Sequence, residues 1–386
     1  MPRRAAALVV SIGLVCGTAG AEAAQPGLNG LLAYDAGGNP REPTRILTVR
    51  PDGTSLRQLT ASRRPSRSPA WSPDGQALAF VAGDFTELGP VVVAERGRRT
   101  RRLTRIGEEP VWSPDGAEIA YLDFLDGDDV KIARADGVGR VRTLPVPGAG
   151  DLYSLSWSPD GGLIAVGGDA AGLHDACCIF AVSARGGEPR TLVEEPARTT
   201  AEHPLWSPDG RTVAFNEIEN CRGRTCSGPV HVVLVDRDGR NRRRLLSNAG
   251  VGAWSPDGRF LLVYVFRPRS GLFTLELATG TRRLAVAGTG FARVDWQPRC
   301  HRLGNGRPNR LRGSAEPELV CGLGGADEID GGRGSDRLLG GRGDDAIDAR
   351  DGGFDVVGCG AGRDVVRADR RDRVGVDCER VVRRAR

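Results

Sequence analysis

Glycines and aspartates recur every nine residues near the carboxyl end of the chain, and this spacing suits the binding of a hard cation. The fullest copies, 331–339 and 340–348, follow the pattern Gly-Gly-x-Gly-x-Asp with a large apolar residue two positions after the aspartate. Glycine permits tight turns that point backbone carbonyls inward, and the carboxylate adds the anionic oxygen that Ca²⁺ prefers. The pattern therefore predicts Ca²⁺ as the cofactor of a small parallel β-roll.

Two nonapeptides make one turn of such a roll, so the aspartates of alternate copies are expected to stack. One edge would carry Asp327, Asp345 and Asp364, and the other Asp336 and Asp355. The predicted metal-binding residues are these aspartates and the glycines of their turns: Asp327, Asp336, Asp345, Asp355, Asp364, Gly325, Gly332, Gly334, Gly341, Gly343 and Gly362. The alternative is a glycine-rich roll that has lost its ions, because few copies are intact.

A roll of this size has little core and needs covalent support, which the cysteines supply. Eight of the nine cysteines follow residue 23, and an even number in an exported chain predicts disulfides. The expected bridges of the roll are Cys300–Cys321 and Cys359–Cys378. The four cysteines that precede the roll allow three pairings, which the sequence leaves open, with a small loop closed by Cys221–Cys226 as one bridge: Cys177, Cys178, Cys221 and Cys226.

A longer repeat precedes the nonapeptides and must form the larger part of the molecule. The pentapeptide Trp-Ser-Pro-Asp-Gly recurs with spacings of 41 to 49 residues, and its copies, the last one worn, start at Trp71, Trp112, Trp157, Trp206, Trp254 and Trp296. Ser-Pro-Asp-Gly is a β-turn between two strands, and a period of this length is typical of a four-stranded propeller blade. Because the residues before Trp71 supply only three strands, residues 292–296 are expected to close a ring of six blades.

These two repeats resemble those of known families. The pentapeptide repeat, over roughly residues 29–298, resembles that of TolB-like β-propellers, and the nonapeptides, over roughly residues 304–367, resemble hemolysin-type (RTX) calcium-binding repeats of secreted bacterial proteins. The first resemblance implies a binding surface rather than a reaction, and the second implies Ca²⁺. TolB also carries an α/β domain before its propeller, which is not expected here.

The first residues are expected to be a signal peptide. Arg3 and Arg4 precede an apolar run that is too short to span a bilayer, and Ala21-x-Ala23 fits a cleavage site. A lipoprotein anchor at Cys16 is disfavoured because Val15 stands where a small residue is needed. The predicted organisation is all-β: signal peptide 1–23, six-bladed β-propeller 24–298, and a small calcium-binding β-roll with a disulfide-stapled cap 299–386. The expected location is secreted, extracellular or at the cell envelope, without a transmembrane segment.

The charge pattern bears on the class of partner. The net charge is +5 and aromatic residues make up 5% of the chain, without the basic stripe interleaved with aromatics that nucleic-acid binders show. Long loops after the second strand of each blade are acidic, as at Glu217 and Glu219, whereas the following hairpins are rich in arginine, as at Arg242 and Arg244. The sequence therefore suggests an acidic propeller face for a protein or cell-envelope partner, although such charges are commonly only solvated. We expect a monomer.

The sequence favours a non-catalytic binding or scaffold module over an enzyme. A hydrolase of the type appended to some propellers needs a Gly-x-Ser-x-Gly elbow, which is missing from this sequence. His174 and His203 are expected in loops, where histidines are usually solvated, although they could approach each other as an acid–base or metal pair. The alternatives are a propeller-based hydrolase or lyase with its site in the central channel, and a structural component of the cell envelope.

Overall fold

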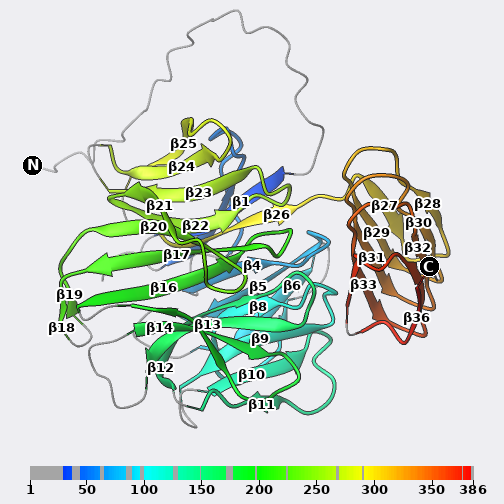
Figure 1. Cartoon of the computed structure of the whole chain (residues 1–386), viewed down its shortest axis with the longest axis horizontal. Coiled ribbons are helices and arrows are strands. Elements are labelled where there is room, and N and C mark those ends of the chain that lie inside the picture. Colours follow the sequence, from blue (N-terminus) through cyan, green and yellow to red (C-terminus); the bar gives the residue numbers. More distant parts are fainter. Residues whose placement is uncertain are drawn as a thin grey trace, which may run out of the picture.

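The computed structural model shows an all-β protein. It describes residues 29–36, 44–60, 65–83, 89–95, 100–124, 129–147, 149–170, 177–195, 198–222, 225–266, 269–288, 291–375 and 377–383, so the expected signal peptide and His174 lie outside the described residues. The described strands form six four-stranded antiparallel sheets, one two-stranded hairpin and two five-stranded parallel sheets (Figure 1). The prediction of a six-bladed propeller followed by a parallel β-roll is confirmed.

Five blades each begin with the strand that leads into a tryptophan-led turn. Their strands are β4–β7 (Ser66–Trp71, Ala77–Ala82, Val91–Glu95, Arg101–Arg102), β8–β11 (Glu108–Trp112, Glu118–Asp123, Asp129–Arg134, Arg142–Leu144), β12–β15 (Ala149–Trp157, Leu163–Ala170, Cys177–Ser183, Arg190–Glu194), β16, β17, β20 and β21 (Thr199–Trp206, Thr212–Glu219, Val230–Asp236, Arg243–Ser247) and β22–β25 (Ala249–Trp254, Phe260–Val265, Gly271–Glu276, Arg282–Ala287). The hairpin β18–β19 (Cys221–Arg222, Thr225–Cys226) extends a loop of the fourth of these blades.

The Ser-Pro-Asp-Gly turn holds its own shape, which explains why it recurs. In the fourth blade the Ser207 hydroxyl donates to Asp209 Oδ1 at 2.6 Å and accepts the Thr212 N–H at 3.0 Å. The same two hydrogen bonds recur in the other four intact turns. Each turn therefore fixes the register of the two strands that it joins.

The two ends of the propeller close the ring together, as predicted. Strand β26 (Phe291–Pro298) pairs antiparallel with β1 (Asn29–Ala36), which continues into β2 (Arg45–Val49) and β3 (Arg57–Gln58). Trp296 lies opposite Leu32 in this pairing, and both are buried. Closure in this way leaves only short strand edges, which face the channel or the outer rim of the ring.

Two of the tryptophans join neighbouring blades by hydrogen bonds. Trp112 Nε1 donates to the Ala70 carbonyl, and Trp254 Nε1 donates to the Leu205 carbonyl, each at 3.0 Å and each in the preceding blade. The predicted position of the indoles between blades is confirmed for these two.

The roll stacks two parallel sheets. One contains β27 (Arg302–Asn305), β29 (Leu319–Gly324), β31 (Arg337–Arg342), β33 (Val356–Ala361) and β35 (Arg373–Val374), and the other contains β28 (Arg310–Arg312), β30 (Glu328–Asp330), β32 (Ala346–Ala349), β34 (Val365–Ala368) and β36 (Arg380–Arg383). Ile329 pairs with Ile347, and Leu338 with Val357, so one turn takes 18 residues, or 19 where a residue is added. These apolar side chains are buried between the sheets and form the core.

The end of the roll differs from the sequence prediction. The roll was expected to end in a disulfide-stapled cap, but β35 and β36 continue both parallel sheets as a last turn. Both strands are rich in arginine, so composition alone concealed their strand character.

The disulfides Cys300–Cys321 and Cys359–Cys378 form as expected. Of the pairings that the sequence left open, Cys221–Cys226 forms, and Cys178 is buried and unpaired. Three disulfides fit an extracytoplasmic location. Within the described part of the chain we find no helix with the length and apolarity that crossing a bilayer requires.

Removal of the Cys300–Cys321 bridge should weaken the roll. The bridge closes a separation of 21 residues, and the double alanine variant is expected to lower the free energy of unfolding by about 3 kcal/mol because the unfolded chain gains entropy. Urea unfolding followed by circular dichroism measures the change. The double alanine variant of Cys221 and Cys226, which frees a loop of 5 residues, should lose less, about 2 kcal/mol; equal midpoints for wild type and the first variant would contradict the prediction.

The roll lies against the propeller face that carries the Ser-Pro-Asp-Gly turns (Figure 1). Arg373 Nη1 donates to the Gly210 carbonyl at 3.2 Å. The guanidinium groups of Arg211 and Arg373 lie 5.4 and 5.3 Å from the centre of the Phe354 ring. This face of the propeller is therefore covered by the chain's own second domain.

Candidate functional site

The structure brings the predicted aspartates together in two ladders along the roll. On one edge, Asp345 Oδ1 accepts the Asp327 N–H and Asp364 Oδ1 accepts the Asp345 N–H, each at 2.8 Å. On the other edge, Asp355 Oδ1 accepts the Asp336 N–H at 2.8 Å. Each carboxylate thus accepts a backbone N–H of the preceding turn, and all five aspartates are at most 2% exposed.

Both ladders extend further than the nonapeptide pattern. Asp372 Oδ1 accepts the Asp355 N–H at 3.2 Å, and Glu379 Oε2 accepts the Asp364 N–H at 2.8 Å. At the other end, the backbone N–H groups of Asn309 and Glu318 donate to the first aspartate of each ladder. Sequence reasoning missed Asp372 and Glu379 because they fall outside the nine-residue period; the available signal was an acidic residue about one turn after each last aspartate.

The second carboxylate oxygen of each aspartate has no donor. Oδ2 is buried without a hydrogen-bond partner in Asp327, Asp336, Asp345, Asp355 and Asp364. Burial raises the pKa of Asp336, Asp345 and Asp355 to about 7 and that of Asp364 to about 6, only partly offset by the backbone N–H bonds. A buried anionic oxygen without a partner is costly, so these atoms fit a site for a hard cation.

The predicted glycines allow the turns to approach closely. A Cβ on any of them would meet the backbone of the preceding turn: Gly325, Gly332, Gly334, Gly341, Gly343 and Gly362. A Cβ on Gly340 would instead overlap with Asp345 Oδ2. The glycines therefore keep open both the carbonyl stack and the space around the unpartnered oxygens.

Two other clusters of metal-ligand types have donors that are already engaged. Arg242 and Arg244 each contact Glu217, and Arg244 also contacts Glu219 at 3.0 Å, beside His231. These acids are neutralised by arginines of the same sheet, so the expected separation of acidic and basic charges onto opposite faces does not hold in this blade.

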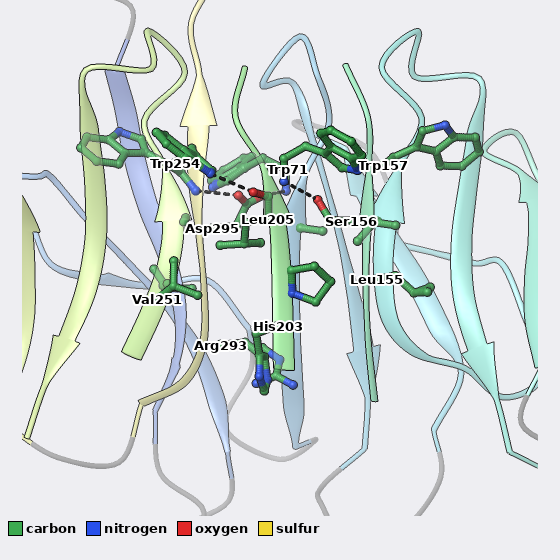
Figure 2. Close-up of a pocket in the computed structure, with 18 of the residues that line it drawn as sticks. Trp71, Leu155, Ser156, Trp157, His203, Leu205, Val251, Trp254, Arg293 and Asp295 are labelled. Carbon is green, nitrogen blue, oxygen red and sulfur yellow. Dashed lines mark hydrogen bonds between the residues drawn. The ribbon is translucent and has the colours of Figure 1, made fainter. Parts of the chain in front are cut away.

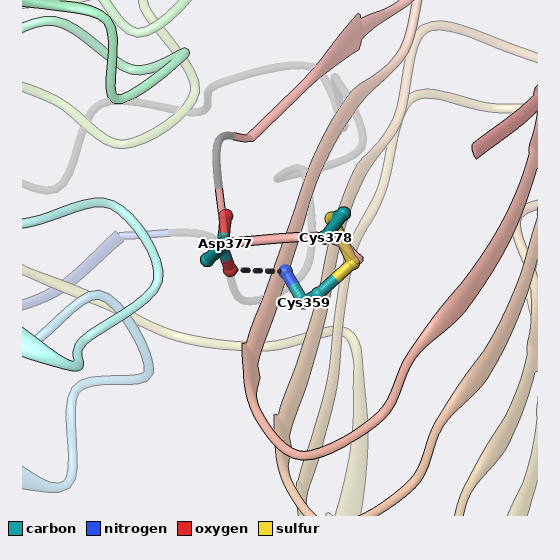
Figure 3. A group of neighbouring side chains, drawn as sticks. All are labelled: Cys359, Asp377 and Cys378. Atoms are coloured by element: carbon teal, nitrogen blue, oxygen red, sulfur yellow. Dashed lines mark hydrogen bonds between the residues drawn. A yellow bond between two sulfur atoms is a disulfide. The ribbon is translucent and has the colours of Figure 1, made fainter. Parts of the chain in front are cut away.

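The second cluster surrounds a disulfide (Figure 3). The sulfurs of Cys359 and Cys378 are bonded to each other. The Asp377 carboxylate accepts the Cys359 N–H at 2.6 Å. Neither thiolate is therefore available as a ligand.

The centre of the propeller holds a cavity of about 440 Å³, lined in rings by the first strand of each blade (Figure 2). The end nearer the roll is apolar, with the six tryptophans and the prolines that follow them: Pro73, Pro114, Pro159, Pro208, Pro256 and Pro298. Deeper in the channel, the residue three positions before each tryptophan belongs to a second ring, called here the polar ring because five of its six side chains are polar: Ser68, Glu109, Ser154, His203 and Arg293, with Val251 as the sixth.

Irregular backbone aims part of this ring into the channel. Ser68, Glu109 and His203 have φ of 52°, 50° and 56°, in the left-handed region that side chains other than glycine rarely adopt. Strand register shifts beside each of these residues, as expected for a β-bulge that redirects a side chain. His203 therefore lies on the inner strand β16 and lines the channel, and the prediction of a solvated loop histidine is wrong.

The polar ring is largely neutralised within itself. Arg293 Nε donates to Glu109 Oε2 at 2.6 Å. Burial holds the pKa of His203 well below its usual range, so its ring is neutral near pH 7. Asp295, in the ring next to the tryptophans, has a pKa raised to about 6 by burial although its oxygens accept the N–H groups of Trp71 and Trp296.

Comparisons with known proteins concern the propeller. No family model matches the chain. Over 146 residues it is 35% identical to the Protein TolB homolog of Chlorobium luteolum, which covers 37% of this chain and 29% of that protein. Over 61 residues it is 43% identical to the Tol-Pal system protein TolB of Aromatoleum aromaticum, and this match covers 16% of this chain and 13% of that protein. Over 138 residues it is 30% identical to the uncharacterized peptidase YuxL of Bacillus subtilis, and this match covers 28% of this chain and 20% of that protein.

The matched segments span less than a third of these relatives' own lengths. Among solved structures, TolB from Acinetobacter baumannii aligns with a TM-score of 0.58 at 19% identity, over 70% of this chain and 67% of that one. A chain of the nidogen/laminin complex aligns with a TM-score of 0.54 at 13% identity, over 70% and 99%. The first domain of this protein is therefore a six-bladed β-propeller that is similar to the propeller of TolB.

Proposed function

We propose that the protein is a non-catalytic binding module, monomeric and secreted or held at the cell envelope, whose propeller binds a protein or envelope partner and whose roll binds Ca²⁺. The observation that carries the calcium proposal is the set of five buried Oδ2 atoms without a donor. The ladder aspartates would supply the carboxylate oxygens and the glycine turns the carbonyl oxygens, an all-oxygen donor set that suits Ca²⁺.

The calcium sites are expected to be weak and structural. Sites in extracellular modules commonly have dissociation constants of about 10⁻⁴ to 10⁻³ M. In millimolar calcium each occupied site would then stabilise the folded roll by about 1 kcal/mol. Bound calcium would offset the mutual repulsion of stacked carboxylates, and this is why a roll with so small a core would keep them.

The binding role of the propeller has separate support. The TolB relatives carry no enzyme name, the ionised pair Glu109–Arg293 is satisfied within the channel ring, and the roll covers one face. The opposite face, which includes hairpin β18–β19, is thus proposed as the partner surface. A pull-down from the native envelope, with the isolated protein as bait, should recover a partner whose capture is lost when this hairpin is replaced.

An enzyme with its site in the channel is the second candidate. Ser68, Glu109 and His203 share a strained backbone conformation and face one cavity, and strain of this kind clusters at functional sites. A hydrolase or lyase would lose turnover on replacement of His203 by Gln with folding unchanged, whereas a binding module has no turnover to lose.

Calorimetric titration of calcium into EDTA-treated, dialysed protein tests the calcium proposal. Asp345→Asn interrupts the longer ladder, because an amide lacks the anionic oxygen, and should weaken calcium binding about tenfold at the adjoining sites. Asp330→Asn, an exposed carboxylate outside both ladders, is the matched control and should bind like wild type. Absence of binding heat, together with equal thermal stability in calcium and in EDTA, would refute the proposal.

A further inference from the structure

The roll contributes a side chain to the end of the propeller channel. Arg337 begins β31 and lines both the 440 Å³ channel cavity and a second cavity of about 620 Å³ between the propeller and the roll. Its side chain therefore lies where the channel cavity and the second cavity meet. Since the propeller alone could not supply this group, any site that uses it is a composite of both domains.

Arg337 lacks a counter-ion. Among the residues that the structure describes, no hydrogen-bond or ion-pair partner is found for its side chain, and its Nε is buried without an acceptor. Arg337 is half-buried, and a buried guanidinium nitrogen without an acceptor is unfavourable, so its retention here points to an anion that the site receives.

The other residues that line the cavity indicate which chemical groups a ligand would need besides an anion. Four of the tryptophans that line the cavity are only half-buried and present part of their rings to it: Trp71, Trp112, Trp157 and Trp254. The acidic group at this level, Asp295, already accepts two backbone N–H bonds at 2.6 and 2.8 Å. The end of the channel nearer the roll thus combines a wall of tryptophans and prolines with the unpaired cation of Arg337.

We propose that Arg337 and the tryptophan ring form a composite site for a small organic carboxylate with a planar apolar body. The planar guanidinium matches a carboxylate through two parallel hydrogen bonds, and a planar body would pack against the indoles. A cavity of 440 Å³ is at the small end of the range of about 300–1,000 Å³ usual for ligand pockets. The proposed envelope and calcium roles assign nothing to this cavity, so the inference goes beyond them.

The test uses the protein's own fluorescence, with benzoate as the probe. All six tryptophans of the chain lead a propeller repeat and line the channel, so the signal comes from its wall. In millimolar calcium, benzoate should change the fluorescence saturably in the wild type, and benzyl alcohol, which has the same ring without the charge, should bind about tenfold more weakly.

Arg337→Met removes the cation with little change in volume. We expect it to weaken benzoate binding about tenfold or more while leaving benzyl alcohol unaffected. Because it also removes an unpaired buried charge, the variant should melt at the same or a higher temperature than ligand-free wild type. A lowered melting temperature with unchanged benzoate affinity would mean that Arg337 only packs between the domains, and would overturn the proposal.

Arg333→Gln is the matched control, since Arg333 is an exposed arginine of the same roll that forms no ion pair with any residue the structure describes, and it should bind benzoate like wild type. If Arg337→Met does not fold, Arg337→Gln takes its place with the same expectation. Equal affinities for benzoate and benzyl alcohol in the wild type would also overturn the proposal. Calorimetry with calcium on Arg337→Met should match the wild type, so failure of the calcium proposal would be seen separately.

Discussion

Without calcium, the roll is expected to lose stability as the pH rises from about 4 to about 7. Burial raises the pKa of Asp336, Asp345 and Asp355 to about 7 in the folded roll, whereas an aspartate in an unfolded chain titrates near 4. Between these values the folded roll binds more protons than the unfolded chain, so the free energy of unfolding falls as the pH increases. Near neutral pH the ladders therefore hold stacked, uncompensated negative charge.

Calcium should reverse this dependence. The metal binds the ionised carboxylates, so its apparent affinity rises as protons leave and falls again below about pH 7. Thermal unfolding followed by far-ultraviolet circular dichroism in EDTA and in millimolar calcium, at about pH 5 and about pH 7.5, measures both trends. The melting temperatures in EDTA and in calcium should differ little at the lower pH and strongly at the higher pH.

Replacement of a ladder aspartate separates this effect from general acid sensitivity. Asp336→Asn removes one of the raised groups and should flatten the pH dependence in EDTA, whereas Asp330→Asn, on an exposed carboxylate, should leave the slope unchanged. A roll that becomes more stable in EDTA as the pH rises from 5 to 7 would show that the aspartates are ionised without metal, contrary to the argument.

The elements that could be predicted from the sequence are those whose hydrogen bonds are local or strictly periodic. Ser207, Asp209 and Thr212 satisfy one another within a single turn, so the motif predicts its structure wherever it recurs. The ladders follow the same logic, since the spacing of Asp327 and Asp345 equals one turn of the roll. The nine-residue period does not continue into β35 and β36, so the sequence did not predict these strands and the last turn of the roll was mistaken for a cap.

The channel depends on relations that no single repeat contains. The ring of Ser68, Glu109 and His203 arises from bulges at equivalent places in different blades, and the repeat motif begins only three residues later. The position of Arg337 depends on how two domains dock. In the sequence Arg337 is simply the variable residue after a repeat aspartate.

Gly343→Ala is expected to disrupt the roll, whereas Gly306→Ala should leave it folded. Gly343 has φ of 127°, and a Cβ there would lie well inside van der Waals contact with the Gly325 carbonyl of the preceding turn. A Cβ on Gly306 meets no atom within 4 Å, and its backbone is not left-handed. The strained backbone costs about 1–3 kcal/mol and the overlap a further 1–3 kcal/mol or so, which together exceed what so small a core can absorb.

The overlap cannot be relieved without moving the proposed calcium ligands. The neighbouring atom is a backbone carbonyl rather than the end of a flexible side chain, so the turn that carries Gly325 must shift as a whole. Urea unfolding in EDTA should show a much lower midpoint for Gly343→Ala than for Gly306→Ala, and excess calcium should restore only part of the difference. Equal midpoints would mean that the turns stack more loosely than the hydrogen bonds between successive aspartates require, and the ladders could not then hold a metal between them.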